Sequence, residues 1–434
     1  MTRHFAIVGA GAGGLCAAKY LTAKGIEVTI FEAGSKVGGL WVYDNDSGMS
    51  PAYKSLHINS EAKVSSFVDF PFPDDAPLYP DHAEMSRYFE RYADHFDLTR
   101  RIRFRSRVKA IEPGGARFRI QLESGETANF DGVVVAPGHQ SVPCHPPQVE
   151  GFTGNYIHAH SYRTPAPYVE QRVLVIGPGN SGVDIAADVC SVTAQTVLSA
   201  RSPVLIMPRM MFGVPNSRIF LKLERPVLPW RARIWLRTTL TRMFHGRMEQ
   251  WGFRTPTTRT HPISHPTLIS QIAWGRVQVK PGIMRVEGRD VGFTDGTTET
   301  FDSIIAATGY NTSIPFLSAD LSPVESGTTH VNLYNRVAHP VVDGLYFIGF
   351  FDVTGGSNIR MMDDQAGYIA ALVTGTVERP TEAVMRSAIA TERAWTVAQF
   401  PDSPRYGLEL DPRRYRRLLA ADFKHRSRAS PGKF

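Results

Sequence analysis

Two glycine-rich turns, each placed between a short apolar strand and an apolar-periodic helix, constrain this 434-residue chain more than any other feature. They cover residues 9–14 and residues 177–182. The first glycine of such a turn closes it tightly, the second lets the backbone approach a pyrophosphate, and the third allows close packing of helix on strand. Free N–H groups at the start of the helix add an anion site. Two such turns predict a protein that holds two dinucleotides and passes electrons between them.

The first turn belongs to a unit that suits FAD or NAD. Residues 5–8 predict a strand, residues 15–24 a helix, and residues 26–31 a second strand that ends at Glu32. A carboxylate there can accept hydrogen bonds from both ribose hydroxyls and would repel a 2′-phosphate. The plainer alternative is a glycine-rich turn followed by a solvent-exposed glutamate. The expected contacts with the dinucleotide are Gly9, Gly11, Gly14 and Glu32.

The second turn repeats this arrangement with a base in place of the acid. A strand over 172–176, a helix over 183–190 and a strand over 196–199 lead to Arg201. A guanidinium at that corner can bind the 2′-phosphate of NADPH in a fork geometry, whereas the alternative is an ordinary surface arginine. The expected contacts here are Gly177, Gly179, Asn180, Ser181, Gly182 and Arg201. We therefore assign FAD to the first unit and NADPH to the second.

Composition excludes several other classes of protein. The net charge is +7, but no nucleic-acid motif accompanies it, and NADPH with other anionic partners accounts for a positive face. The cysteines, Cys16, Cys144 and Cys190, are far apart and form no CxxC pair. This pattern argues against a disulfide framework, a zinc ribbon and a dithiol reductase, and it favours a reducing, cytoplasmic location.

Membrane and metal signals are equally weak. No apolar run reaches the roughly 18 residues of a membrane-spanning helix, and the first strand begins too early to leave room for a signal peptide. His261 and His265 have the spacing of a metal pair on a helix, but each is followed by a proline that disfavours a helix. We expect no metal site.

The expected fold class is α/β, with two Rossmann-like dinucleotide-binding domains, the NADP domain being inserted into the FAD domain. Buried segments around 130–135 and 301–306 each lead to a glycine, as in a return from a nucleotide-binding domain. The FAD domain is expected to comprise 1–165 and 305–434, with a C-terminal tail that frays from Phe423. The NADP domain is expected over 166–304, with a helical insertion near 205–260. A strand over 344–349 and a helix over 363–374 would lie beside the flavin, with the helix dipole directed at it.

Residues 152–163 contain the pattern F-x-G-x-x-x-H-x-x-x-Y just before the second unit. This segment resembles the fingerprint of the flavin-containing monooxygenases. The related Baeyer–Villiger monooxygenases usually carry Trp where Tyr162 stands, and the family commonly has Lys where Arg163 stands. The resemblance extends over about 1–375, with further matches at 38–41, 53–60, 69–74, 307–310 and 315–317.

The resemblance implies an NADPH- and O₂-dependent FAD monooxygenase of the bacterial soluble type. Such an enzyme oxygenates a soft nucleophile, the nitrogen or sulfur of a small amine, sulfide or heterocycle, through an FAD C4a-hydroperoxide. The protein would orient the cofactors and exclude water. Expected cofactor contacts from the matching segments are Gly39, Trp41, Thr308, Gly309 and, at the start of the flavin-side helix, Gln365.

Asn59 is the one residue that we expect to be catalytic. The resemblance places the asparagine of this stretch at the active site, where an amide that donates and accepts suits a flavin adduct or a nicotinamide. The alternative is a turn-forming asparagine. His158 is expected to satisfy a buried backbone carbonyl rather than to act chemically, and Tyr162 to pack between the domains.

Two other functions remain open at this stage. The first is Baeyer–Villiger oxygen insertion into ketones, which Tyr162 disfavours, and the second is an FAD/NADPH oxidase or redox-binding protein that oxygenates nothing. The basic, aromatic stretch 229–253 can lie on a membrane surface, but we expect it to pack on its own domain or on a partner subunit. A homodimer is compatible with the sequence, and the expected partners are a small nucleophile and O₂, without nucleic acid.

Overall fold

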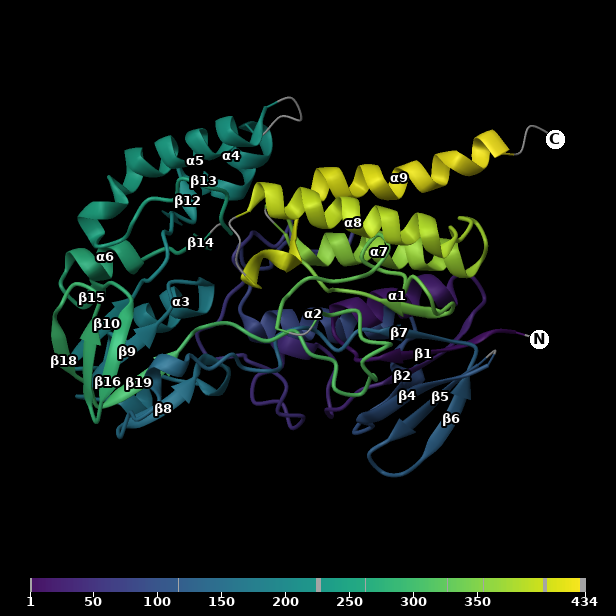
Figure 1. The fold of residues 1–434 in the computed structure, drawn as a ribbon, viewed down its shortest axis with the longest axis horizontal. Coiled ribbons are helices and arrows are strands. Elements are labelled where there is room, and N and C mark those ends of the chain that lie inside the picture. Colours follow the sequence, from purple (N-terminus) through teal and green to yellow (C-terminus); the bar gives the residue numbers. More distant parts are fainter. Residues whose placement is uncertain are drawn as a thin grey trace. The chain divides into compact units, whose positions relative to one another are not determined.

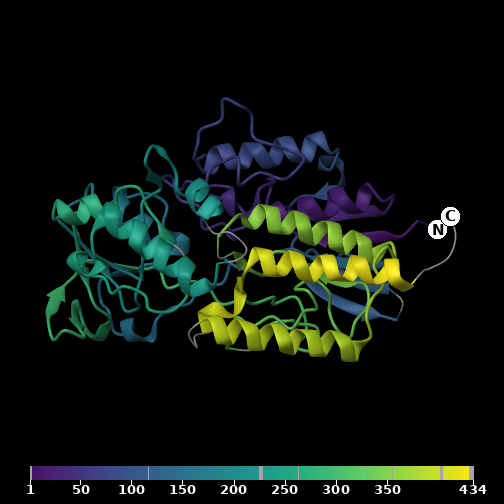
Figure 2. The ribbon, with the colours of Figure 1, turned by 90° about the horizontal axis from the view of Figure 1, so that it is seen from above.

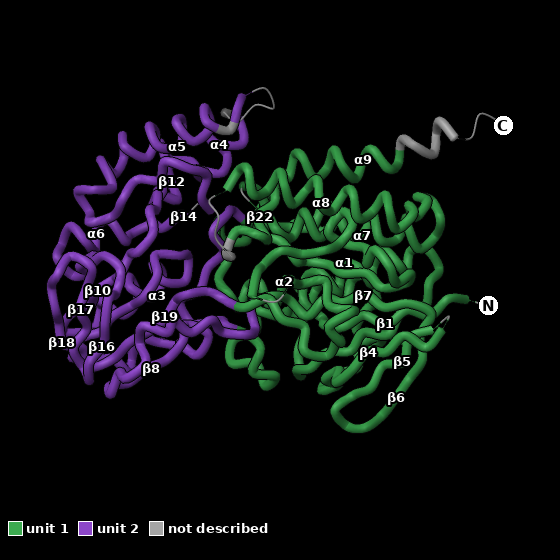
Figure 3. The backbone as a smooth tube through the Cα atoms, in the orientation of Figure 1, with its two compact units in different colours: residues 1–50, 62–139, 311–434 green, residues 51–61, 140–310 purple. Residues whose placement is uncertain are grey.

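A computed structural model describes residues 2–115, 117–223, 228–261, 263–325, 327–353, 355–400 and 404–429. The chain forms two compact units (Figure 3). Unit 1 consists of residues 1–50, 62–139 and 311–434, and unit 2 consists of residues 51–61 and 140–310. Each unit has its own parallel sheet and its own buried apolar core.

The main sheet of unit 1 has five parallel strands in the order β20-β7-β1-β2-β3. All four residues of β7 are buried, as expected for a central strand that is covered on both faces. The strands are β1 (His4–Val8), β2 (Glu27–Phe31), β3 (Ile102–Arg103), β7 (Gly132–Val135) and β20 (Leu345–Phe347). Between β3 and β7 the chain forms an antiparallel sheet of β4 (Val108–Gly114), β5 (Arg117–Leu122) and β6 (Thr127–Phe130). Later in the chain, β21 (Asp352–Val353) pairs with β22 (Glu409–Leu410).

The helices of unit 1 are α1 (Ala12–Thr22), α2 (His82–His95), α7 (Asn358–Val373), α8 (Glu382–Gln399) and α9 (Pro412–Ala429). α7 packs on α1, and the axes of α7, α8 and α9 are roughly aligned, with α8 running opposite to α7 and α9 (Figures 1 and 2). Asp422 of α9 accepts hydrogen bonds from Tyr334, Asn335 and Tyr368. These bonds connect α9 to α7 and to the segment that precedes β20.

The main sheet of unit 2 also has five parallel strands, in the order β15-β10-β9-β19-β8. They are β8 (Asn155–His158), β9 (Arg172–Ile176), β10 (Gln195–Ser199), β15 (Val277–Lys280) and β19 (Ser303–Ala306). An antiparallel sheet of β16 (Ile283–Glu287), β17 (Asp290–Phe293) and β18 (Thr298–Thr300) lies between β15 and β19 in the chain. The helices are α3 (Asn180–Val189), α4 (Asn216–Leu223), α5 (Trp230–His245) and α6 (Leu268–Ala273). Two short strand pairs complete the unit: β11 (Ile206–Met207) with β14 (Ile263–Ser264), and β12 (Met210–Met211) with β13 (Val214–Pro215).

The two main sheets repeat the same strand order. Strands β3-β2-β1-β7 of unit 1 correspond to β15-β10-β9-β19 of unit 2, and each set contains a three-stranded antiparallel sheet at the same point of the chain. The fifth place is taken by β20, late in the chain, in unit 1 and by β8, which precedes β9, in unit 2. The chain thus contains two copies of one α/β dinucleotide-binding arrangement, and the expected fold class is confirmed.

The boundaries of the units differ from those expected near 165 and 305. β8 and β19 both belong to the sheet of unit 2, because β19 pairs with β9 on one side and with β8 on the other, so residues 140–165 and 305–310 join that unit. Residues 51–61 also join unit 2, since Tyr53 and Leu56 pack in its core. Helices α4 and α5 fall within the insertion expected near 205–260.

One expectation for the C-terminal helices is wrong. α7 begins at Asn358, where the Ser357 hydroxyl accepts a bond from the Arg360 N–H, so Gln365 lies inside the helix rather than at its start. The segment from Phe423 was expected to fray; α9 extends to Ala429, and residues 430–434 lie outside the described residues.

Candidate cofactor and active site

The two glycine-rich turns have the same backbone geometry. Gly9 and Gly177 each have φ of +102°, a conformation that glycine adopts without strain. A Cβ on Gly14 would lie 1.9 Å from the carbonyl oxygen of Gly9, and a Cβ on Gly182 would lie 1.8 Å from that of Gly177. In both units, therefore, the third glycine is required because the helix begins in direct contact with the turn.

Gly11 serves a different purpose from Gly14. It is the N-cap of α1 with φ of −79°, and a Cβ there would make only ordinary contact, 3.6 Å from the Cα of Gly39. The protein's own packing does not require a glycine at this position, whereas the approach of a pyrophosphate to the helix N-terminus does. Gly39 begins the one-turn helix η1 (Gly39–Trp41) beside this turn, and Trp41 is half-buried there. The residues of this turn fit FAD.

Glu32 is buried directly after β2, so the solvent-exposed alternative is wrong. Its side chain is 7% exposed, and its two carboxylate oxygens accept the N–H groups of Ala10 and Gly34, each at 2.7 Å. Burial raises the pKa of the Glu32 carboxyl above its ordinary value, and the two N–H donors oppose that rise. One donor comes from the turn itself, which holds the carboxylate at the carboxyl edge of the sheet.

The second turn has a matching set of residues in unit 2. Asn180 begins α3, and its buried side-chain Oδ1 has no hydrogen-bond partner in the described part of the chain, as expected of a group that serves a ligand. Thr308 and Gly309 follow β19, and the Thr308 hydroxyl donates to the carbonyl of Cys144. A Cβ on Gly177 would lie 2.6 Å from the carbonyl oxygen of Ala307. Thr308 and Gly309 thus accompany the second turn, although they were expected in the second part of the FAD domain.

Arg201 is exposed, two residues after β10. Gly282 leaves room for it, since a Cβ at Gly282 would lie 3.1 Å from the Cγ of Arg201. The guanidinium of Arg254 donates to the backbone carbonyl of Arg201, which adds a second cation at this corner. Sequence reasoning missed Arg254 because it follows the helical insertion and belongs to no local motif.

The fingerprint segment lies inside unit 2. His158 ends β8, its Nδ1 accepts the backbone N–H of His160 at 3.1 Å, and the backbone of Gly309 also interacts with its side chain. Burial lowers the pKa of His158 to about 4, so the ring is neutral at neutral pH. Tyr162 is buried, donates to Asp188 of α3 at 2.7 Å, and packs edge-on against Tyr53. His158 and Tyr162 thus stabilise the fold of unit 2 rather than supply a reacting group.

Asn59 lies in the segment 51–61 and is exposed, while its side-chain Oδ1 accepts a bond of 3.0 Å from the guanidinium of Arg209. Arg209 is 8% exposed and lies 3.9 Å from a carboxylate oxygen of Asp184 on α3. The other oxygen of Asp184 accepts from the Tyr53 hydroxyl at 2.7 Å. The segment is therefore held by polar contacts to α3 and to the chain after β11.

Two titratable groups in the cluster around Arg209, namely Asp184 and His265, have strongly shifted pKa values. Burial raises the pKa of Asp184 to about 6. Burial, with a smaller contribution from Arg209, lowers the pKa of His265 to about 3. The Nδ1 of His265 accepts the N–H of Leu268 at 2.8 Å, so its Nε2 carries the proton and faces Asp184 at 3.3 Å. Sequence reasoning missed Asp184 and Arg209, and it considered His265 only as a metal ligand.

Gln365 is fully buried, and both ends of its amide bind backbone within unit 1. Its Oε1 accepts the N–H of Gly349 at 2.9 Å, and its Nε2 donates to the carbonyl of Arg336 at 3.2 Å. We therefore assign it to holding the turn after β20 rather than to the expected direct contact with the cofactor. His139 was missed: its Nδ1 lies 3.0 Å from the carbonyl of the same Gly349, and its Nε2 lies 3.5 Å from Asp352.

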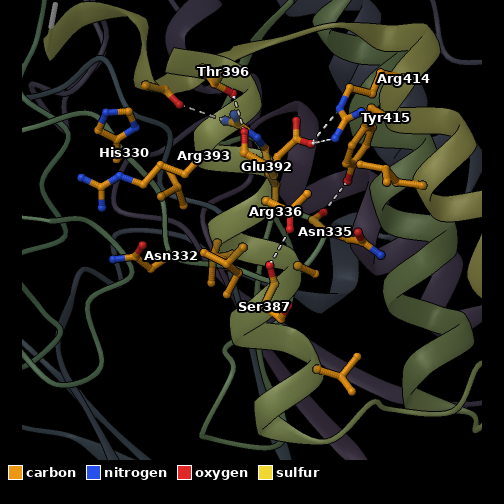
Figure 4. A pocket seen from close by; sticks show the side chains of 18 of the residues that line it. His330, Asn332, Asn335, Arg336, Ser387, Glu392, Arg393, Thr396, Arg414 and Tyr415 are labelled. Carbon is orange, nitrogen blue, oxygen red and sulfur yellow. Dashed lines mark hydrogen bonds and ion pairs between the residues drawn. The ribbon is translucent and has the colours of Figure 1, made fainter. Parts of the chain in front are cut away.

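A cavity of about 550 Å³ lies in unit 1 between α8, α9 and the segment 330–336 (Figure 4). None of the residues predicted from sequence lines it. Its polar groups largely bind one another: Arg414 pairs with Glu392 at 2.8 Å, and the Tyr415 hydroxyl donates to the carbonyl of Asn335 at 2.7 Å (Figure 4). This cavity is thus separate from the residues that form the two turns.

The basic, aromatic stretch 229–253 forms α5 and the chain after it. Leu240 packs on the cluster of Met207, Met211 and Phe220, as expected for packing on its own domain. Trp235, by contrast, is 67% exposed, so the expectation holds for one face only. Among the described residues, no helix is long and apolar enough to cross a membrane.

Comparisons with known proteins agree with this arrangement. Residues 2–411 match the family described as flavin-binding monooxygenase-like. The chain is 31% identical to flavin-containing monooxygenase 3 of Rattus norvegicus over 410 residues, which cover 88% of this chain and 76% of that protein. It is 30% identical to dimethylaniline monooxygenase [N-oxide-forming] 2 of Cavia porcellus over 426 residues, 93% of this chain and 79% of that protein.

The chain belongs to the flavin-binding monooxygenase-like family. Among solved structures, it is similar to S-allyl-L-cysteine S-oxygenase of Allium sativum, with a TM-score of 0.73, 25% identity, and coverage of 98% of this chain and 89% of that one. It also has a TM-score of 0.73 to a cyclohexanone monooxygenase of Rhodococcus, with coverage of 99% and 98%, but at 17% identity this likeness concerns the fold alone. The protein is an NADPH-dependent FAD monooxygenase that acts with O₂ on a small molecule.

Gly11, the N-cap of α1, and Gly14, in the first turn of α1, give a matched pair of variants. Gly14→Ala places a methyl group against the Gly9 carbonyl, so we expect it to lower the stability of the apoprotein by about 1–3 kcal/mol and to weaken FAD binding. Gly11→Ala meets no tight contact, so the apoprotein should keep its melting temperature while FAD affinity falls. Circular dichroism of the apoproteins and fluorescence titration with FAD measure the two effects. Equal loss of stability in both variants would contradict this division of roles.

Arg201→Ala should affect NADPH and NADH differently. Loss of charge-assisted bonds to the 2′-phosphate should raise the KM for NADPH about 10- to 100-fold, whereas NADH, which lacks that phosphate, should be affected less than about twofold. Steady-state NAD(P)H oxidation measures both constants. Arg285→Ala, an exposed arginine of β16, is the control. The same increase for both nucleotides would remove Arg201 from the phosphate site.

Asp184 should make the stability of the protein depend on pH in a defined direction. Because its folded pKa of about 6 exceeds its ordinary value of 3.8, its contribution to stability is greatest below pH 4 and is lost as the pH rises through 6. The melting temperature of the wild type should therefore fall relative to that of Asp184→Asn between pH 4 and pH 7. Asp290→Asn, which changes an exposed carboxylate of the same unit, controls for net charge. A pH-independent difference would mean that Asp184 has no raised pKa.

Proposed function

We propose that the protein transfers one oxygen atom to the nitrogen or sulfur of a small, soft nucleophile such as a tertiary amine, a sulfide or a heterocycle. The observation that carries this proposal is the pair of matching glycine-rich turns, each followed by a charged residue that we propose contacts a ribose. The charges are opposite: unit 1 has the buried acid Glu32 and unit 2 has the exposed base Arg201. The names of two relatives support the substrate class: one is N-oxide-forming and another is an S-oxygenase.

FAD reduced by NADPH would activate O₂, which supplies the oxygen atom to be transferred. The residues of the chain bind and orient. We propose that Glu32 and the turn containing Gly9, Gly11 and Gly14 bind the adenosine and pyrophosphate of FAD, and that Gly39 and Trp41 border the same site. In unit 2 the turn from Gly177 to Gly182 and Arg201 would bind NADPH, with Thr308 and Gly309 beside it.

Asn59 is the proposed catalytic residue. Its amide can hydrogen-bond to a cofactor without gaining or losing a proton, which suits a reaction in which the nucleophile itself attacks oxygen. A soft nitrogen or sulfur nucleophile needs no general base from the protein. His265 in the neighbouring cluster is not available as a base, because its Nδ1 accepts the N–H of Leu268 and its Nε2 carries the proton that faces Asp184.

The remaining predictions concern the partners, the cellular location and the oligomeric state of the protein rather than its chemistry. We propose a small nucleophile and O₂ as the partners and keep the cytoplasmic location and the homodimer as predictions. The exposed Trp235 supports a partner surface on α5, and mass measurement in solution would test it.

The proposed substrate class predicts a clear order of reactivity. With NADPH and O₂, N,N-dimethylaniline and a dialkyl sulfide should each gain one oxygen atom, detected by mass spectrometry, whereas cyclohexanone should react at least about tenfold less efficiently, a difference of about 1.4 kcal/mol in activation free energy. Substituting ¹⁸O₂ should label the product.

Two results would contradict the proposal. Formation of a lactone in preference to an N-oxide or sulfoxide would establish Baeyer–Villiger oxygenation. Consumption of NADPH with release of hydrogen peroxide alone, whatever substrate is present, would establish an oxidase.

A further inference from the structure

Arg209 is bound to only one end of the Asn59 amide. The guanidinium Nη2 of Arg209 lies 3.0 Å from Oδ1 of Asn59, and Arg209 is buried while Asn59 is exposed. Within the described residues, Nδ2 of Asn59 has no hydrogen-bond partner. Both residues belong to unit 2, so the contact lies within one compact unit.

The chemistry of the guanidinium decides how this amide is oriented. The oxygen and nitrogen of an asparagine amide have nearly the same shape, so the partner determines which atom faces it. Arginine has five N–H donors, no acceptor, and no accessible deprotonated state. Only Oδ1 can therefore face Arg209, and the two N–H groups of Nδ2 must point away from it, toward the exposed side of the residue.

The position of Arg209 is itself determined by buried neighbours. Asp184 lies 3.9 Å from the same Nη2, and its carboxylate is also bound by Tyr53 at 2.7 Å and faced by His265 at 3.3 Å. Tyr53 comes from the same segment 51–61 as Asn59, and Asp184 comes from α3, which begins at the second glycine-rich turn. Buried charged groups with several partners have little freedom to rotate.

We propose that Arg209 is a positioning residue that makes Asn59 a hydrogen-bond donor, and not an acceptor, toward the bound cofactors. This inference rests on the proposed catalytic role of Asn59. It narrows that role, because an amide by itself can both donate and accept. The group that Asn59 serves must then be an acceptor atom of the flavin or nicotinamide, or an oxygen that accumulates negative charge during the reaction.

The most informative substitution is Asn59→Asp. An aspartate has the same shape, and it can pair with Arg209, but its carboxylate has no N–H to present. We expect the variant to retain FAD and a melting temperature at least equal to that of the wild type. The fraction of consumed NADPH that yields oxygenated product should fall about tenfold or more, corresponding to a lost donor in the transition state, while hydrogen peroxide rises.

Substitutions of Arg209 test the positioning step. In Arg209→Gln the new side chain has both a donor and an acceptor, so the Asn59 amide can flip. In Arg209→Lys the new side chain has only donors, so Oδ1 of Asn59 should still face it. We expect Arg209→Gln to retain FAD and near-normal reduction by NADPH, with a product fraction that is lower than in the wild type and partly restored in Arg209→Lys. Arg218→Gln removes a guanidinium that binds the same segment at Glu61, so it measures general loosening and should change the product fraction less.

A spectroscopic measurement on the holoenzyme gives a readout that does not depend on turnover. In protein labelled with ¹⁵N-asparagine, the side-chain amide signals of Asn59, assigned by their absence in Asn59→Asp, should shift or broaden in Arg209→Gln and stay near their wild-type positions in Arg209→Lys. Unchanged signals in Arg209→Gln would overturn the proposed orientation. This result would be distinct from failure of the proposed function, in which the wild type would oxygenate no amine or sulfide.

Two further outcomes would also overturn the proposal. Full product yield in Asn59→Asp would show that no N–H donor is required. A change in the Kd for NADP⁺ in Arg209→Gln without a change in product fraction would show that Arg209 binds the nucleotide directly rather than positioning Asn59.

Discussion

The contact between the third glycine of each turn and the carbonyl of its first glycine is the constraint on which the rest of this structure depends. In both units there is no space for a Cβ at Gly14 or Gly182. The helix consequently begins against the end of the central strand, and its free N–H groups lie at the carboxyl edge of the sheet. Because both turns have this geometry, the same order of four strands is built around each, and each sheet carries its turn at the same edge.

Charge then distinguishes the two sites that this repeated geometry creates. Glu32 is buried and bound by two backbone N–H groups, one of them from the turn, so its carboxylate is held in one place at a cost in desolvation. Arg201 is exposed and accompanied by Arg254, an environment that keeps a cation well hydrated until a phosphate arrives. A ribose with free hydroxyls suits the first position and a phosphorylated ribose the second.

The sequence predicted what depends on neighbouring residues and missed what depends on distant ones. The strands and turns follow from periodicity and from glycine spacing, and the structure places β9 at the predicted residues. The unit boundaries, the role of Gln365 and the partners of Asn59 depend on pairings such as β19 with β8 and Arg209 with Asn59, which join residues far apart in the chain. Family resemblance pointed to Asn59, but it contained no information on which end of the amide is free.

The segment 51–61 shows why this distinction matters for function. It follows the first glycine-rich unit in the chain, yet it packs in the unit of the second turn, where Tyr53 binds Asp184. Asp184 lies on α3, the helix whose first residue belongs to that turn, and it also lies beside Arg209. Asn59, the proposed catalytic residue, is therefore held by the unit that contains the second glycine-rich turn. A substitution at Asp184 or Arg209 should accordingly affect the orientation of Asn59 while leaving Glu32 and the first turn intact, since no hydrogen bond described between these residues joins the two sets.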